Sequence, residues 1–281
     1  MAPIHPVKIS AYIPCYNNQD TIAQAIASVQ GQSYPIDDVF VIDDGSSDDS
    51  VAKVQSIGIR IVRHEANLGR GAIRARAMRE ARNDLVLCCD ATNAVAPDFI
   101  TGALPWFDDS RLAGVFGRIT QPPARNVVER WRGRHLFRLG TPHPMHHGAM
   151  LSTHGAVVRR SAVMAVGNFA ASLRHTEDGE LGTRLLGAGY DIVYDPNLLV
   201  TSVAKNSLFQ VLERRWRWQV GIEERVSWPD YLSQIAYSVK VMVREDLRDG
   251  DPFSVPISLL SPHYQFWKSK FGKLQNSKLP S

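Results

Sequence analysis

The first ninety residues alternate short apolar runs with segments of helical periodicity, and this alternation restricts the chain to few folds. Mostly apolar runs lie at 9–13, 39–42, 59–62 and 85–89. Between them, segments such as 21–30 place apolar side chains on one face of a helix. Strands separated by helices of about ten residues form βαβ units and a mostly parallel sheet. Because the runs show no clear polar alternation, we expect helices on both faces of this sheet.

The composition is that of a globular protein and argues against several classes. With 281 residues, 44% of them hydrophobic, the chain suffices for one large domain or for a domain with an appendage. No apolar stretch reaches the roughly 18 residues of a membrane-spanning helix, and residues 1–8 lack the apolar run of a signal peptide. The three cysteines, Cys15, Cys88 and Cys89, indicate buried thiols in a reducing compartment. We therefore expect a cytoplasmic protein.

Polar, turn-forming residues follow each of the four predicted strands. They occupy positions 14–18, 43–46, 65–71 and 90–93. In a parallel sheet these positions meet at one edge, outside the carboxyl ends of the strands, where ligands bind. Each segment alone is typical of a simple turn. Together the four segments predict one polar cleft.

The order of these motifs resembles family 2 of the glycosyltransferases, which have the GT-A fold. The matching segments are Ile13-Pro14-Cys15-Tyr16-Asn17, Val41-Ile42-Asp43-Asp44-Gly45-Ser46-Ser47-Asp48, Asn67-Leu68-Gly69 with Arg74, Asp90-Ala91-Thr92-Asn93 and Thr176-Glu177-Asp178-Gly179-Glu180-Leu181. The resemblance covers about residues 8–222. It implies an α/β, Rossmann-like GT-A fold with a mostly parallel central sheet flanked by helices, plus a C-terminal helical extension.

The resemblance also implies a domain organisation. Residues 1–222 would form the glycosyltransferase domain, with a nucleotide-binding half at about 8–118 and an acceptor half at about 119–222. Residues 223–281 would form a helical or irregular extension. The stretch 120–150 is rich in Pro, Arg and His, and we interpret it as a long loop near the site or as a solvated insertion.

By resemblance, the loops after the strands bind a nucleotide sugar. The expected binding residues are Pro14, Tyr16, Asn17, Asp44, Asn67, Arg74, Asp90, Ala91, Glu177, Arg217 and Trp218. The Tyr16 ring can stack on a base, and the Asp44 carboxylate can accept the imide N–H of uracil. A UDP-linked donor is therefore favoured over a cytidine-linked one. Arg74 suits nucleotide or phosphate oxygens; the alternative is a surface arginine on an exposed helical face.

Asp90-Ala91-Thr92 stands where the family carries its metal-binding Asp-x-Asp motif. In the family, Mg²⁺ or Mn²⁺ bridges the two phosphates of the donor and neutralises the leaving group. Here Thr92 replaces the second carboxylate, and a hydroxyl is a far weaker ligand for such an ion. Three outcomes stay open. Asp90 and Asn93 hold a metal, basic groups such as Arg74 or Arg217 neutralise the phosphates, or the protein is weak or inactive as a catalyst.

Asp178 is the general base of the reaction by resemblance. It would deprotonate the acceptor hydroxyl, and the reaction would invert the anomeric centre; a positioned base contributes about 10²- to 10⁴-fold. The alternative is that Glu177 and Asp178 only favour a helix N-terminus.

Arg217 and Trp218 match the end of the Gln-x-x-Arg-Trp segment of processive members, although Arg214 stands in place of the glutamine. Arg217 suits a diphosphate, and Trp218 suits the acceptor sugar. The rival interpretation is a basic amphipathic helix on an anionic membrane.

We therefore expect an inverting glycosyltransferase that moves a sugar from a nucleoside-diphosphate sugar to a hydroxyl of a glycan, lipid or other acceptor. The alternative is a catalytically weak or inactive sugar-nucleotide-binding protein, which Thr92 motivates. Nucleic acid is not an expected partner, because the basic residues are dispersed through the chain. The tail at 264–273 mixes aromatic residues and lysines. This composition suits either a helix that docks on the body or peripheral membrane contact.

Overall fold

The computed structural model describes residues 7–219 and 225–276, with side chains described as far as residue 271. The chain divides into two compact units. One unit comprises the chain up to residue 122 together with 142–204, and the other comprises 123–141 and the chain from 205 onward. Helix α8 (Leu208–Gln219) therefore groups with the C-terminal helices. The predicted end of the glycosyltransferase domain at residue 222 stays a prediction, because the two compact units are defined by contacts within the chain and not by function.

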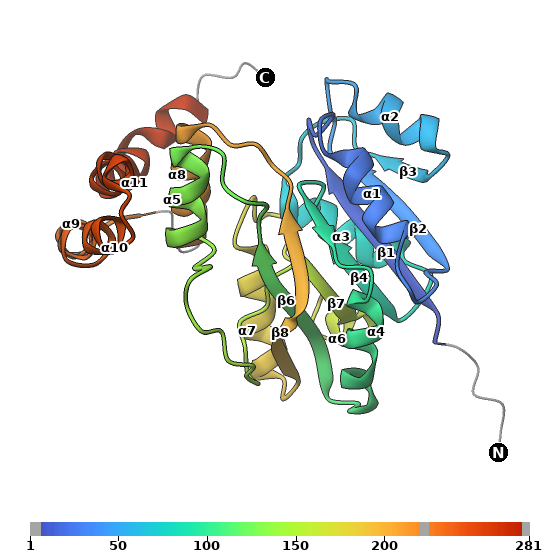
Figure 1. Cartoon of the computed structure of the whole chain (residues 1–281). Coiled ribbons are helices and arrows are strands. Elements are labelled where there is room, and N and C mark those ends of the chain that lie inside the picture. Colours follow the sequence, from blue (N-terminus) through green and yellow to red (C-terminus); the bar gives the residue numbers. More distant parts are fainter. Residues whose placement is uncertain (1–6, 220–224, 277–281) are drawn as a thin grey trace. The chain divides into compact units, whose positions relative to one another are not determined.

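The first unit is built on one mixed sheet (Figure 1). Among the described residues the strand order is β3-β2-β1-β4-β7-β6-β8-β5. The strands are β1 (Ile9–Cys15), β2 (Asp38–Asp43), β3 (Arg60–Arg63), β4 (Leu85–Cys89), β5 (Asn93–Val95), β6 (Leu112–Thr120), β7 (Gly155–Arg159) and β8 (Asp191–Ser202). The half from β3 to β4 is parallel, as the sequence predicts. Strand β7 runs antiparallel to β4 and β6, and β5 runs antiparallel to β8, so the whole sheet is mixed rather than mostly parallel.

Helices cover both faces of this sheet. They are α1 (Ile22–Gln30), α2 (Ser50–Ile57), α3 (Arg70–Glu80), α4 (Phe99–Ala103), α6 (Arg160–Ala165) and α7 (Glu177–Gly187), with the 3₁₀ helix η1 (Leu104–Asp108). Strand β1 sends Ile9 and Ile13 into the core under α1, and Tyr12 into the core under α3. Successive side chains of a strand point to opposite faces. Tyr12 therefore lies on the side of the sheet that carries α3 and α7.

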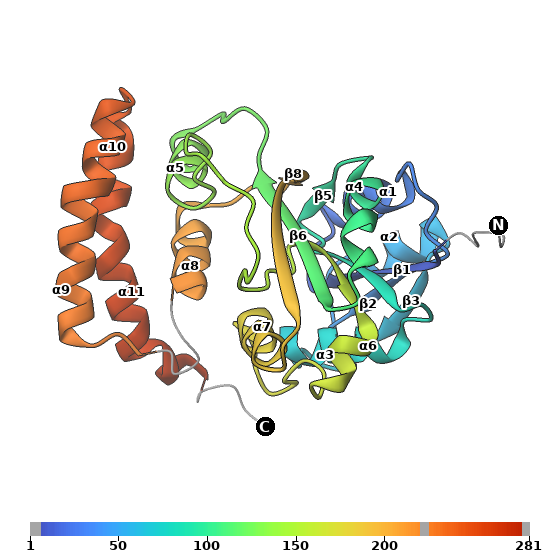
Figure 2. The same cartoon turned by 90° about the horizontal axis from the view of Figure 1, so that it is seen from below.

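The second unit is helical. Its elements are α5 (Val127–His135), α8, α9 (Trp228–Tyr237), the π-helical turn η2 (Ser238–Met242), α10 (Val243–Arg248), the 3₁₀ turn η3 (Pro252–Ser254) and α11 (Val255–Asn276). Helices α9 and α10 lie alongside α11 (Figure 2). Trp131 of α5, Leu212 of α8 and Ile257 of α11 form part of its apolar core. In the described part of the chain, none of the helices is both long and apolar enough to cross a membrane.

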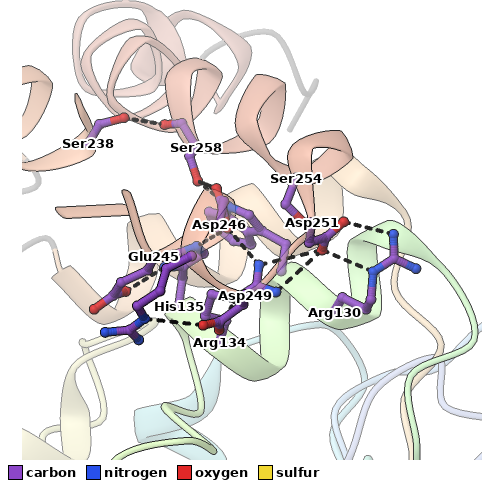
Figure 3. Close-up of polar contacts among 12 residues, drawn as sticks. Arg130, Arg134, His135, Ser238, Glu245, Asp246, Asp249, Asp251, Ser254 and Ser258 are labelled. Atoms are coloured by element: carbon purple, nitrogen blue, oxygen red, sulfur yellow. Dashed lines mark hydrogen bonds and ion pairs between the residues drawn. The ribbon is translucent and has the colours of Figure 1, made fainter. Parts of the chain in front are cut away.

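A buried polar network joins α5 to the C-terminal helices (Figure 3). Arg134 donates to Asp246 over 2.6 Å, and the hydroxyl of Ser258 donates to the other oxygen of Asp246 over 2.6 Å. Arg130 forms two hydrogen bonds of 2.9 Å with Asp251. Segment 123–141 is therefore held to α10 and η3 by charge pairs as well as by apolar contacts, which explains why it belongs to the second unit.

Three sequence interpretations need correction. The stretch 120–150 is not a continuous loop, because it contains α5, whose start is capped by the Asn126 side chain accepting from the backbone of Glu129. Strand β6 was not predicted. Helix α11 continues through Pro262, although a proline in the interior of a sequence segment normally ends a helix. Tertiary packing of α11 against α8 and α9 outweighs the single backbone donor that Pro262 removes.

The three cysteines behave as the composition predicts. All are buried and free of disulfides. Burial raises the pKa of the Cys88 thiol to about 11, so this thiol stays protonated at neutral pH.

Candidate functional site

Asp44 fixes the start of helix α3. Its carboxylate accepts from the backbone N–H groups of Leu68 (3.0 Å) and Gly69 (2.8 Å), and the imidazole Nδ1 of His64 lies 2.7 Å from it. Asp44 is buried. Through these bonds the loop after β2 positions the loop that leads into α3. The expected contact between Asp44 and a uracil ring is not tested by these contacts and stays a prediction.

The loop after β1 is bound to the loop after β2. The backbone N–H of Asn17 donates to the hydroxyl of Ser46 over 2.9 Å, and the Asn17 amide oxygen accepts from the backbone of Ser47 over 2.9 Å. Next to this junction the Tyr16 ring is 46% exposed, while Pro14 is half-buried. A tyrosine so exposed at the edge of the sheet is accessible to a ligand.

Arg74 lies at the centre of the site. Its side chain is 2% exposed, so the alternative of a surface arginine is wrong. Nε donates to Glu177 over 2.8 Å, and the two terminal nitrogens donate to the Tyr12 hydroxyl (3.0 Å) and to Asp90 (2.8 Å). Burial lowers the pKa of Arg74, but its negative partners outweigh burial and raise this pKa above its usual value. Arg74 thus connects β1, the loop after β4 and the start of α7.

Asp90 is held in its ionised form. Burial alone would raise its pKa, but the guanidinium groups of Arg74 and Arg70 outweigh burial and lower the pKa below its usual range. Arg70 is the first residue of α3, one turn before Arg74, so both side chains project from the same face of the helix. Among the described residues, the half-buried side chain of Arg70 forms no ion pair or hydrogen bond. Sequence analysis missed Arg70, although a basic residue between two glycines at a helix start is a recognisable signal.

Glu177 and Asp178 open helix α7 with different surroundings. Glu177 is buried against Arg74, and its second oxygen, Oε2, has no hydrogen-bond partner in the described part of the chain. Asp178 is half-buried, and its Oδ2 accepts from the backbone N–H (3.2 Å) and the hydroxyl (3.3 Å) of Thr153. Thr153 was not foreseen, because it lies 25 residues before Asp178. Thr153 thus fixes the position of the Asp178 carboxylate at the start of α7.

The residues near Asp90 do not fit a metal held by the protein. Thr92 supplies no carboxylate, and one oxygen of Asp90 is bound to Arg74. Asn93 is fully buried, and its amide nitrogen donates to the backbone of His154 over 2.8 Å. No group of three His, Cys, Asp or Glu side chains suitable for a metal occurs within residues 7–219 and 225–271. The amide oxygen of Asn93, the atom that would ligate a metal, is buried and has no hydrogen-bond partner among the described residues, so the role of Asn93 stays a prediction, and we derive no reaction step through a metal.

The remaining predicted residues are placed as follows. Asn67 accepts hydrogen bonds from Arg174, which connects the start of α3 to the segment before α7. Ala91 is buried beside Asp90. Arg217 and Trp218 lie on α8 in the second unit, where the half-exposed Trp218 ring is 6.0 Å from the Phe137 ring. The structure therefore brings the other predicted residues together in the first unit, and the roles of Arg217 and Trp218 stay predictions.

Several solved glycosyltransferases resemble this chain in structure. A mannosyltransferase from Pyrobaculum calidifontis, in complex with GDP-Man and Mn²⁺, matches with a TM-score of 0.60 and 16% identity, over 99% of this chain and 77% of that chain. Staphylococcus aureus TarS 1–349, in complex with UDP-GlcNAc, matches with a TM-score of 0.58 and 16% identity, over 96% of this chain and 76% of that chain. At such identities the likeness shows the fold, which is the GT-A fold that the sequence motifs predict.

The chain belongs to glycosyltransferase family 2. The family model for Glycosyl transferase family 2 matches residues 10–167. An N-acetylglucosaminyltransferase of Mesorhizobium japonicum is 27% identical over 234 residues, which cover 75% of this chain and 54% of that protein. The succinoglycan biosynthesis protein ExoU of Rhizobium meliloti is 29% identical over 223 residues, covering 69% of this chain and 62% of that protein. The chain thus spans less than two thirds of the length of either relative.

Proposed function

We propose that this chain is an inverting glycosyltransferase that uses a UDP-linked sugar, with Asp178 as its general base. The observation that carries the proposal is the position of Arg74. This one buried side chain joins Asp90, after β4, to Glu177, the neighbour of Asp178. This contact supports one site that contains the acids which the family resemblance assigns to the donor and to the acceptor, at the edge of the sheet where ligands of α/β proteins bind.

The donor would lie across the loops after β1 and β2. The exposed Tyr16 ring would stack on the base, and the loop that Asp44 holds would border the ribose and the phosphates. UDP-GlcNAc is the first donor to assay. Relatives carry the name N-acetylglucosaminyltransferase, and a structural neighbour was solved with UDP-GlcNAc.

In the proposed step, the Asp178 carboxylate takes the proton of the acceptor hydroxyl. The acceptor oxygen bonds to the anomeric carbon as the bond from that carbon to the diphosphate oxygen breaks. UDP leaves with the bonding electron pair. Thr153 would keep the Asp178 carboxylate in place, because its backbone N–H and its hydroxyl both donate to Oδ2. A glycan, a lipid or another hydroxyl compound fits this chemistry as acceptor.

The negative charge of the leaving diphosphate requires a cation at the site. Arg74 is committed to three protein partners. Arg70 is the better candidate, because it lies one turn earlier on the same face of α3 and forms no ion pair or hydrogen bond among the described residues. We assign to Arg70 the contact with the donor phosphates.

Replacement of Asp178 by Asn tests the proposal. We expect transfer from UDP-GlcNAc, or from whichever UDP-sugar of a panel is turned over, to fall by about 10²- to 10⁴-fold. Donor affinity, measured by isothermal titration calorimetry, should change by less than about threefold. Asp108→Asn, on an exposed residue of η1, is the matched control and should keep full activity. Full activity of D178N would refute the role of Asp178.

A second candidate function is a sugar-nucleotide-binding protein with weak or no catalysis. Thr92 favours this alternative, because it removes a carboxylate from the motif that the family uses for its metal. Calorimetric binding of UDP-GlcNAc without transfer or donor hydrolysis for any donor of the panel would support it. The cytoplasmic location expected from the sequence stays a prediction.

A further inference from the structure

The helices of the second unit surround a polar cavity of about 400 Å³. It lies between α8, α9, η2 and α11, and the nine described residues that line it all belong to the second unit. The volume is in the range of cavities that bind small molecules, about 300–1,000 Å³. Among these nine residues only Met242 and Pro262 are apolar, and none is acidic. The cavity is therefore suited to a polar ligand and not to a lipid chain.

The cavity lies where two helical segments depart from regular geometry. Pro262 has no backbone N–H, so α11 leaves the carbonyl oxygen of Ser258, four residues earlier, without its helical donor. The hydroxyl of Ser238 donates to this oxygen over 2.6 Å (Figure 3). Ser238 begins the π-helical turn η2, and π-helical turns frequently occur at functional sites. Pro262 and Met242, the last residue of η2, both line the cavity.

Arg215 of α8 is the one charged side chain among the described lining residues. It is 6% exposed, and it forms no ion pair in the described part of the chain. Its Nη1 donates to the carbonyl oxygen of His135 over a long 3.4 Å, and its guanidinium carbon lies 5.8 Å from the centre of the Trp131 ring. Burial lowers the pKa of Arg215 to about 10, which leaves the side chain charged at neutral pH.

The surroundings of Arg215 leave its charge without a negative partner. Removing a cation from water costs free energy unless an anion or several hydrogen bonds compensate it. A guanidinium carries several N–H donors, and the bond to His135 is the one hydrogen bond that Arg215 forms within the described chain, where Nε has no acceptor. A carboxylate or phosphate in the cavity would supply both the charge and the acceptors, because its oxygens match the planar fork of arginine.

Two amide side chains define the rest of the ligand. Gln265 of α11 is 2% exposed, and its Nε2 forms a hydrogen bond of 3.5 Å with Ser261. The amide oxygen of Gln234, on α9, is buried and has no hydrogen-bond partner among the described residues. An amide both donates and accepts hydrogen bonds, as a hydroxyl group does. A ligand with one anionic group and several hydroxyl groups would therefore satisfy Arg215 and both glutamines.

We propose that this cavity binds a hydroxylated organic acid of monosaccharide size, with its carboxylate or phosphate on Arg215 and its hydroxyl groups on Gln234 and Gln265. Uronic acids and sugar phosphates share this chemistry. The lining residues include none of those assigned above to the donor or to the acceptor. The proposal does not depend on the proposed function, because its readout is binding and not transfer.

Isothermal titration calorimetry of the full chain with four probes tests the proposal. We expect D-glucuronate or D-glucose 6-phosphate, or both, to bind with a Kd below about 1 mM. Glucose lacks the charge and inorganic phosphate lacks the carbon-bound hydroxyl groups, so each should bind at least about tenfold more weakly. The charged sugar that binds more tightly identifies the source of the acid. Absence of binding by both charged sugars, or equal binding of glucose or of inorganic phosphate, would overturn the proposal.

Arginine variants locate the ligand. Arg215→Met should weaken binding of the charged sugar by about tenfold or more, because charge-assisted hydrogen bonds are lost. Arg244→Met, at an exposed residue of α10 outside the lining, is the matched control and should bind as the parent does. Arg70→Ala should also bind as the parent does, which distinguishes the cavity from the proposed donor site. Unchanged affinity of the folded R215M, or loss of binding in R70A, would overturn the assignment to this cavity.

A second variant keeps the test independent of the folding of R215M. Circular dichroism and thermal unfolding show whether each variant folds. Gln234→Leu replaces a half-buried side chain and should weaken binding by about threefold or more. The charged sugar should raise the Tm of the parent, and raise it less in Q234L, because a ligand that binds the folded state stabilises that state. If R215M does not fold, an unchanged affinity of Q234L would overturn the proposal.

Discussion

The Nε atom of Arg74 lies 2.8 Å from Oε1 of Glu177, although 103 residues separate them in the chain. Both side chains are almost completely buried. A second nitrogen of Arg74 binds Asp90 over 2.8 Å. Arg74 thus neutralises two acids, Glu177 and Asp90. Removal of any one of these three side chains would leave a buried charge without its partner and destabilise the fold.

Arg74→Met should therefore lower the free energy of unfolding by about 3–5 kcal/mol. The variant leaves the Glu177 carboxylate buried without a cation. Urea unfolding followed by circular dichroism measures the loss. Arg79→Met is the matched control on the same helix; this residue is exposed, and its replacement should change stability by less than about 0.5 kcal/mol.

A double variant separates charge from packing. If the unpaired carboxylate causes the loss, Arg74→Met combined with Glu177→Gln should be more stable than Arg74→Met alone. A double variant that is no more stable than the single one would contradict the charge explanation.

Chelation of divalent metals is expected to leave transfer largely intact. In the part of the chain that the structure describes, the motif after β4 presents one carboxylate, Asp90, where a metal site needs several hard ligands. In about 5 mM EDTA, which chelates divalent metal ions, the activity should stay within about twofold of the activity of the untreated enzyme. Complete and Mn²⁺-reversible loss of activity would show that a metal carries the diphosphate charge.

Arg70→Ala should lower kcat/KM for the donor by about 10²- to 10³-fold, the effect expected when a group that stabilises developing charge is removed. The measurement is initial-rate kinetics over a range of UDP-sugar concentrations. Arg79→Ala, on the same helix and exposed, is expected to behave as the parent. Equal kinetics for R70A and the parent would remove Arg70 from the site.

Gly71 permits a close approach between α3 and the segment before α7. A Cβ atom at this position would lie 2.1 Å from the carbonyl oxygen of Ala170 and 2.6 Å from that of Leu173. The backbone N–H of Gly71 also donates to Leu173 over 2.9 Å. Gly71→Ala should therefore destabilise the first unit by about 1–3 kcal/mol and reduce activity, because it displaces the segment that leads to Asp178.

Gly187→Ala is the control for this substitution. Gly187 ends α7, and a Cβ there would meet no heavy atom within 4 Å. This change should be neutral or stabilising by up to about 1 kcal/mol, because alanine loses less backbone entropy than glycine on folding. Thermal unfolding of both variants tests the pair; equal effects would contradict the steric argument.

Asp251 should give the second unit a pH-dependent stability. Hydrogen bonds from Arg130 lower the pKa of Asp251 to about 2, whereas an unfolded aspartate has a pKa near 3.9. A depressed pKa in the folded state contributes stability above the unfolded pKa, and this contribution disappears as the pH falls through about 2. Asp251→Asn should thus lower stability by about 2 kcal/mol at pH 7, and the difference from the parent should shrink below about pH 4.

Denaturant unfolding at about pH 7, 5 and 3 measures this dependence, because these pH values span the pKa of an aspartate in the unfolded chain. Asp108→Asn, at an exposed residue of η1, should show no such trend. A difference between D251N and the parent that stays constant from neutral to acid pH would contradict the assignment to the Arg130–Asp251 pair.

Local patterns in the sequence suffice to predict the first half of the fold and the order of the motifs. The strands at 9–13, 39–42 and 85–89 and the helix at 21–30 appear where their periodicity predicts them, with ends that differ by one or two residues. These features are local, since a period of 3.6 residues or a short apolar run is visible in any window of ten residues. The family motifs are likewise contiguous, and for that reason they could be recognised without coordinates.

The contacts of Arg74 and the placement of segment 123–141 depend on elements that are distant in the chain. Nothing in the periodicity of α3 distinguishes an exposed arginine from one bound to Tyr12 and Glu177, because burial depends on elements far away in the chain. Segment 123–141 joins the second unit through pairs such as Arg130–Asp251, which span 121 residues. The antiparallel direction of β7 and β5 likewise depends on pairing between residues that are far apart in the chain. Such long-range choices follow from packing and charge pairing, which no local pattern encodes.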